Sequence, residues 1–123
     1  MKLLLDTHAF LWWDSNDARL PSALYTAIAS PQNQVFVSAV TVWEIAIKRG
    51  LGKLVFAGTL GKAIEGHGFT ALPITVEQAE SAGSLPLLHR DPFDRLLVAQ
   101  AQLEGLILVT VDEDILRYAV PRL

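Results

Sequence analysis

The chain has 123 residues, of which 51% are hydrophobic and 19% charged, with a net charge of −3; these values predict one compact domain with a sizeable core. Cysteine is absent, which excludes disulfide scaffolding, thiolate catalysis and cysteine-bound zinc. No apolar run approaches the roughly 18 residues of a membrane-spanning helix, and "MKLLLDTH" reaches an acid too early for a signal peptide, so a cytoplasmic protein without membrane contact is expected.

Short apolar runs alternate with helical patterns, which is typical of an α/β fold with a parallel sheet. In chain order the expected elements are a strand at 2–5, a helix at 21–30, a strand at 34–37, helices at 40–50 and 56–68, a strand at 71–74, helices at 75–83 and 91–105, and a strand at 106–111. The strand at 71–74 is the poorest candidate because Pro73 lies inside it. The helix at 91–105 is the clearest, since Asp91 is a good N-cap and Pro92 suits the first helical position.

Four acids follow the predicted strands or lie near the starts of helices: Asp6, Glu44, Asp94 and Asp112. The strand-to-helix turns of an open parallel sheet gather at one edge, where ligands usually bind. Each acid alone has a structural explanation, because acids cap helix starts, and Thr41 with Glu44 fits a capping box. Asp94, however, is surplus to a helix that Asp91 already caps. Converging carboxylates raise each other's pKa unless a cation separates them, which indicates a Mg²⁺ or Mn²⁺ site for phosphate esters.

Four stretches together resemble the successive motifs of PIN-domain nucleases, specifically the VapC-type toxins: "LLLDTHAFLWW", "VSAVTVWEIAIKRGLGKL", "HRDPFDRLLVAQA" and "LVTVDEDI". The resemblance implies one PIN domain over residues 1–123, built as an α/β/α sandwich with a short parallel sheet. It also implies metal-dependent endoribonuclease activity and neutralisation by a VapB-type antitoxin. The family's acidic quartet corresponds to Asp6, Glu44, Asp94 and Asp112. Thr110 matches a polar residue that the family often has, and Asp114 is the alternative to Asp112.

One or two Mg²⁺ (or Mn²⁺) ions at this site are expected to polarise a phosphate and activate a water molecule. Asp6 and Asp94 are the preferred direct ligands, while Glu44 and Asp112 bind directly or through water. The acidic net charge argues weakly against RNA binding. Without the four site acids, however, nine acids remain against ten bases, so local basic patches can bind RNA.

The best candidates for RNA phosphate contacts are four basic residues near the predicted acidic edge: Lys48, Arg49, Lys53 and Arg95. An equal alternative for Lys48 and Arg49 is that they only complement a helix C-terminus. His8 adjoins Asp6 and could assist protonation, although a structural role is the more common one for a lone histidine. His67 and His89 have less support.

A protein partner is expected from the family resemblance. A partly exposed apolar groove for the antitoxin is predicted from four residues: Trp43, Leu51, Leu54 and Phe56. A homodimer is also expected. Two other functions remain open: a phosphate-monoester hydrolase with Asp6 as nucleophile, and a non-catalytic receiver-like signalling domain. Internal cleavage of RNA, phosphate release from small esters and uptake of acetyl phosphate distinguish the three.

Overall fold

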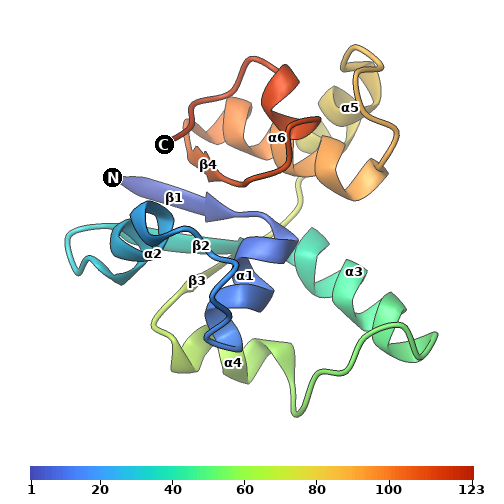
Figure 1. Ribbon diagram of the computed structural model, residues 1–123. Coiled ribbons are helices and arrows are strands. Elements are labelled where there is room, and N and C mark those ends of the chain that lie inside the picture. Colours follow the sequence, from blue (N-terminus) through green and yellow to red (C-terminus); the bar gives the residue numbers. More distant parts are fainter.

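The computed structural model, which describes residues 1–123, contains a parallel sheet with helices packed on both faces (Figure 1). Its elements are β1 (Lys2–Leu5), α1 (Thr7–Asp14), α2 (Ser22–Ala29), β2 (Gln34–Ser38), α3 (Ala39–Gly50), α4 (Leu60–Gly66), β3 (Thr70–Leu72), α5 (Val76–Ser84), α6 (Pro92–Glu104), β4 (Ile107–Val109) and a 3₁₀ turn at Ile115–Arg117. The strand order is β3-β2-β1-β4. This architecture confirms the predicted α/β/α sandwich. None of the helices has the length and apolarity needed to cross a membrane.

Strand β1 is buried on both faces. Leu3 and Leu5 pack in one core with residues of α1, α2, α3 and α4, whereas Leu4 packs in a second core with residues of α6. All three side chains are fully buried. Burying one leucine side chain stabilises a fold by roughly 1.5–3 kcal/mol, so a continuous apolar run is favoured where both faces of a strand are covered.

The register of the sheet brings three strand ends to one edge. Leu5 of β1 pairs with Val37 of β2 on one side and with Val109 of β4 on the other. The chain leaves these strands through Asp6, Ser38 and Thr110, all of which are buried. Polar residues from distant parts of the sequence therefore meet at this edge, as the parallel topology predicts.

Several boundaries differ from the sequence-based expectation. The strand expected at 106–111 is limited to Ile107–Val109, and the one expected at 71–74 is Thr70–Leu72. The latter is an edge strand that ends just before Pro73, where the missing backbone N–H removes no sheet hydrogen bond. The helix expected at 56–68 is limited to Leu60–Gly66.

The predicted capping box at Thr41 is wrong. Helix α3 begins at Ala39, and its N-cap is Ser38, whose hydroxyl accepts a hydrogen bond from the Val40 N–H at 3.0 Å. Thr41 is buried inside the helix. Because the helix begins earlier than expected, Glu44 lies in its second turn rather than at its start.

Candidate metal and nuclease site

Asp6 is fixed by two hydrogen bonds at the end of β1. As N-cap of α1, it accepts a hydrogen bond from the Ala9 N–H at 2.8 Å through Oδ1. The Thr110 hydroxyl donates to Oδ2 at 2.6 Å. Burial raises the pKa of Asp6, and the negative charge of Asp112 adds to this effect, while the two hydrogen bonds oppose it. The structure thus holds a buried carboxylate whose charge is only partly compensated.

Glu44 is buried, and both of its oxygens have partners. The Thr7 hydroxyl donates to Oε1 at 2.6 Å, and the Lys48 ammonium donates to Oε2 at 2.6 Å. The hydrogen bond to Glu44 raises the pKa of Lys48, and the charges of Asp91 and Asp94 act in the same direction. Lys48 is therefore electrostatically close to the acids, although it also lies in the last turn of α3.

Asp94 lies in the first turn of α6 and is surplus to capping, as predicted. Asp91 is the N-cap, and its side chain accepts hydrogen bonds from the N–H groups of Phe93 and Asp94. Burial and then the charge of Asp91 raise the pKa of Asp94 to about 7. Glu44 adds to the rise, while the hydrogen bond with His89 opposes it. Asp94 is accordingly a carboxyl group that lacks a sufficient positive neighbour near neutral pH.

Asp112 follows β4 and meets a histidine. Nε2 of His89 lies 2.9 Å from Asp94 Oδ2 and 3.7 Å from Asp112 Oδ2. Ligand atoms of His89, Asp112 and Asp114 all lie within 4.8 Å of one another, a spacing that suits one metal ion. Asp112 also accepts a hydrogen bond from the Asp114 N–H at 2.8 Å, and the 3₁₀ turn that follows it begins at Ile115.

The four predicted acids form a connected neighbourhood. Asp112 influences the pKa of Asp6, His89 joins Asp112 to Asp94, and Glu44 influences the pKa of Asp94. Hard carboxylate oxygens are the ligands that Mg²⁺ and Mn²⁺ prefer. The donor set, together with the raised pKa values of Asp6 and Asp94, therefore fits a divalent cation. The group whose ligand atoms all lie within 4.8 Å of one another consists of His89, Asp112 and Asp114, and it does not include Asp6, Glu44 or Asp94.

His89 is the residue that the sequence analysis missed. The sequence favours His8 over it, but His8 is exposed and stacks on Trp12 with ring centroids 5.6 Å apart. The available signal was its position five residues before Asp94, in the segment that enters α6. His67 pairs with Asp14 at 2.8 Å and has no contact with the four acids.

The other basic candidates are not brought to the acids by any contact. Arg49 donates to the carbonyl of Gly58 at 3.0 Å and so braces the segment after α3, while Lys53 is exposed. The Arg95 guanidinium is engaged by the segment between α5 and α6: its terminal nitrogens donate to the carbonyls of Ala82, Leu85, Pro86 and His89 and to the Tyr118 hydroxyl. These hydrogen bonds give Arg95 a structural role, because they hold the segment between α5 and α6 in place.

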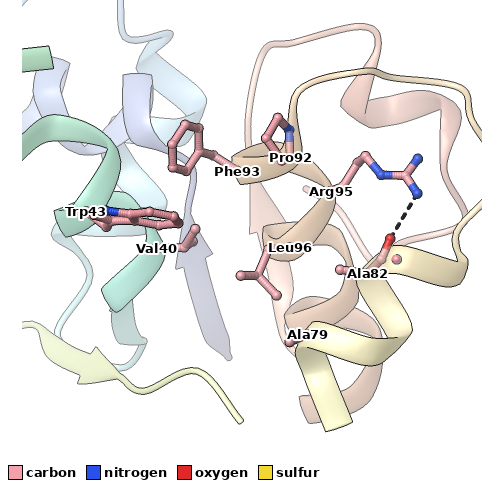
Figure 2. Close-up of a pocket in the computed structure, with 9 residues that line it drawn as sticks. Val40, Trp43, Ala79, Ala82, Pro92, Phe93, Arg95 and Leu96 are labelled. Atoms are coloured by element: carbon pink, nitrogen blue, oxygen red, sulfur yellow. Dashed lines mark hydrogen bonds between the residues drawn. The ribbon is translucent and has the colours of Figure 1, made fainter. Parts of the chain in front are cut away.

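The predicted antitoxin groove is divided between two hollows. Trp43 and Val40 of α3 face Phe93 and Leu96 of α6 across a hollow of about 250 Å³, which α5 closes on a third side (Figure 2). Leu54 and Phe56 belong to a different hollow, of about 340 Å³, together with residues of α1. Leu51 lines neither hollow, although it is 65% exposed. A single groove over all four residues is therefore wrong.

Comparisons with known proteins agree with this architecture. The sequence matches the family described as PIN domain over residues 3–121. It is 30% identical over 128 residues to Ribonuclease VapC22 of Mycobacterium tuberculosis, covering 98% of this chain and 94% of that protein. The fold is similar to VapBC2 from Rickettsia felis bound to a promoter DNA fragment, with a TM-score of 0.67, 14% identity, and 100% and 98% of the two chains covered. A toxin–antitoxin complex from Klebsiella pneumoniae gives a TM-score of 0.64 at 18% identity, with 98% and 95% covered.

Proposed function

This chain belongs to the PIN-domain family, and we propose that it is a VapC-type, metal-dependent endoribonuclease, the toxin of a VapBC-type toxin–antitoxin pair. The observation that supports this most directly is the meeting of Asp6, Glu44, Asp94 and Asp112 around one edge of the parallel sheet. The likeness to a ribonuclease extends over nearly the whole chain. We also propose that residues 1–123 make up one PIN domain.

In this proposal the four acids hold one or two Mg²⁺ or Mn²⁺ ions. Asp6 and Asp94 bind directly, Glu44 and Asp112 bind directly or through water, and Asp114 is the alternative to Asp112. Held by these residues, a divalent cation would supply Lewis-acid polarisation of a phosphodiester and activation of water for its hydrolysis. The raised pKa values of Asp6 and Asp94 support this assignment, because a positive ion stabilises the charged carboxylates.

The neighbouring residues orient these ligands. Thr110 restricts Asp6 by donating to Oδ2, and Thr7 restricts Glu44 by donating to Oε1. Lys48 is the strongest of the predicted phosphate contacts. Its partly exposed ammonium forms an ion pair with Glu44, and the negative charge of Asp94 raises its pKa. An ammonium so placed attracts the phosphate of an RNA strand and holds it beside the acids. Arg49 and Lys53 are retained as weaker candidates.

The proposed partners are RNA as substrate, a VapB-type antitoxin and a second copy of the chain. Solved proteins with this fold include toxin–antitoxin complexes, which supports the antitoxin. The hollow between α3, α5 and α6 offers an apolar surface for one of its segments, because Trp43 is 59% exposed there. Cleavage of cellular RNA corresponds to a cytoplasmic site of action.

The test is incubation of the purified protein with total cellular RNA and either Mg²⁺ or Mn²⁺, beside the Asp6→Asn variant. Asparagine keeps a side-chain oxygen that can accept from Ala9 N–H but removes the charge that binds a cation. We expect internal cleavage by the native chain, loss of cleavage on chelation, and at least about a hundredfold loss in the variant, a typical cost of removing an electrostatic contributor. Equal cleavage by both proteins would point to a contaminant and contradict the proposal.

The two other functions are not favoured. Both assign a covalent or signalling role to a single aspartate, whereas the match to the PIN domain extends over residues 3–121 and includes all four acids. Release of phosphate from small esters without RNA cleavage, or stable labelling by acetyl phosphate, would replace the proposed function with one of them.

A further inference from the structure

His89 lies among three of the acids, although the resemblance assigns it no role. Its Nε2 atom is 2.9 Å from Asp94 Oδ2 and 3.7 Å from Asp112 Oδ2, and Asp114 completes a group within 4.8 Å. The ligand atoms of His89, Asp112 and Asp114 are therefore close enough together to bind a single ion. Its chemistry differs from that of the predicted quartet, because one donor is an imidazole nitrogen.

The position of His89 is fixed by its backbone. Its N–H donates to the Tyr118 hydroxyl at 3.0 Å, and the same hydroxyl donates to the Pro86 carbonyl at 2.7 Å. Arg95 donates to the carbonyls of Pro86 and His89 and to the same Tyr118 hydroxyl. The side chain is only 16% exposed. The imidazole is therefore held close to the carboxylates. A histidine that served only as a solvent-exposed surface residue would not need such a fixed position.

We infer that His89 is a nitrogen ligand of one of the proposed divalent cations, together with Asp112 and Asp114, and that it makes this position favour Mn²⁺ over Mg²⁺. The inference rests on the proposed function for the presence of a divalent cation. Mg²⁺ strongly prefers an all-oxygen octahedral shell, whereas imidazole nitrogen is a good ligand for first-row transition metals. Coordination requires a neutral ring with its proton on Nδ1, so that the Nε2 lone pair faces the ion.

The test is pulsed electron paramagnetic resonance of the full chain loaded with Mn²⁺, because electron spin echo envelope modulation reports ¹⁴N bound to the ion. We expect ¹⁴N coupling in the native protein, none in His89→Gln, and full coupling in the matched control His67→Gln. His67 pairs with Asp14 outside the acidic neighbourhood. Glutamine at position 89 is similar in size to histidine and offers an amide oxygen in place of the ring nitrogen, and an unchanged thermal unfolding midpoint verifies its folding.

Metal affinities give a second measurement. Mn²⁺ titration of His89→Gln is expected to show a dissociation constant at least about tenfold higher than that of the native chain, the lower end of the effect of altering a metal site's surroundings. The dissociation constant for Mg²⁺, measured by competition, should change by less than about threefold, since an amide oxygen replaces the nitrogen.

Absence of ¹⁴N coupling in the native protein, or coupling that persists in His89→Gln, overturns the inference. So does an equal loss of Mg²⁺ and Mn²⁺ affinity in the variant. The native chain's activity on RNA is scored separately: ¹⁴N coupling without RNA cleavage refutes the proposed ribonuclease and leaves the nitrogen ligand established.

Discussion

Ionisation of Asp94 lowers the free energy of unfolding as the pH rises, which is the opposite of the effect of an ordinary ion-paired aspartate. Its pKa is raised to about 7, from an ordinary value of 3.8, so the folded state disfavours its charged form. The stability that the protonated Asp94 side chain contributes is fully present below pH 3.8, where the group is protonated in both the folded and the unfolded state. It is lost as the pH rises to 7, by about 4 kcal/mol at 1.36 kcal/mol for each pKa unit.

Asp94→Asn should therefore stabilise the protein above neutral pH in the absence of divalent cations. Asparagine preserves the size of the side chain and a carbonyl acceptor for His89, but it cannot ionise. We expect a gain of up to about 4 kcal/mol in the free energy of unfolding at pH 8, and no gain at pH 4. Urea unfolding at the two pH values measures this difference.

A suitable control for Asp94→Asn is Asp114→Asn, because the Asp114 side chain is 59% exposed. This change should alter the free energy of unfolding by less than about 0.5 kcal/mol at either pH. A native chain that is more stable than Asp94→Asn at pH 8 contradicts the assigned direction.

Thr110 connects two of the acids through one hydroxyl. It donates to Asp6 Oδ2 at 2.6 Å and accepts from the Asp112 N–H at 3.0 Å. Thr110→Val removes both bonds and leaves buried polar groups unpaired, at a cost of about 1–3 kcal/mol. We expect lower stability and weaker binding of the divalent cation, measured by thermal unfolding and calorimetric titration. Thr110→Ser keeps the hydroxyl and should behave like the native protein; equal losses in both variants would show that the methyl packing matters instead.

At the scale of the elements, local signals predicted α6 better than α3. The Asp91–Pro92 pair supplies a cap and a first-turn proline within two residues, and the helix indeed begins at Pro92. The start of α3 was misjudged because Ser38 and Thr41 are both good N-caps. The choice depends on where β2 ends in the sheet, and Ser38 pairs with Leu72 of β3 at that end. This information is tertiary, so the local pattern could not supply it.

The segment between α5 and α6 is held in part by one side chain distant in the sequence. The Tyr118 hydroxyl accepts from the N–H groups of Leu88 and His89 and donates to the Pro86 carbonyl. Tyr118→Phe should therefore lower the free energy of unfolding by about 1 kcal/mol, because two partly buried amides lose their acceptor. It should also accelerate amide hydrogen exchange at Leu88 and His89, measured by mass spectrometry or NMR.

The matched control for Tyr118→Phe is Tyr25→Phe, since Tyr25 is 47% exposed. That variant should leave both the stability and the exchange of the α5–α6 segment unchanged. Native exchange rates at Leu88 and His89 in Tyr118→Phe would show that Arg95 alone suffices to hold the segment.

At the scale of the whole molecule, the parallel topology explains why much of the site could be predicted. Residues that follow different strands must meet at one edge, so Asp6 and Asp112 could be paired without coordinates. The partners of the site acids do not follow from the strand topology. Lys48 contacts Glu44 because the two residues are four apart on one helix, which is a local relation. His89 contacts Asp94 from a loop whose position depends on Tyr118, and this relation is tertiary.

The division of the apolar surface into two hollows gives a test of where the proposed antitoxin binds. Trp43 is 59% exposed and its ring meets that of Phe93 edge-on, with centroids 5.3 Å apart, across the hollow between α3 and α6 (Figure 2). Exposed aromatic anchors commonly contribute about 2 kcal/mol or more to binding. Trp43→Ala should therefore weaken binding of the antitoxin encoded beside this chain by about thirtyfold, as measured by calorimetry.

Leu51→Ala distinguishes this arrangement from the continuous groove expected from the sequence. Leu51 is 65% exposed but lines neither hollow, so its truncation should change the dissociation constant by less than about threefold. Because both side chains are largely in solvent, neither variant should lose more than about 1 kcal/mol of folding stability. Equal weakening of antitoxin binding by the two variants would support a continuous groove. Unchanged binding by Trp43→Ala would show that the antitoxin does not bind at α3.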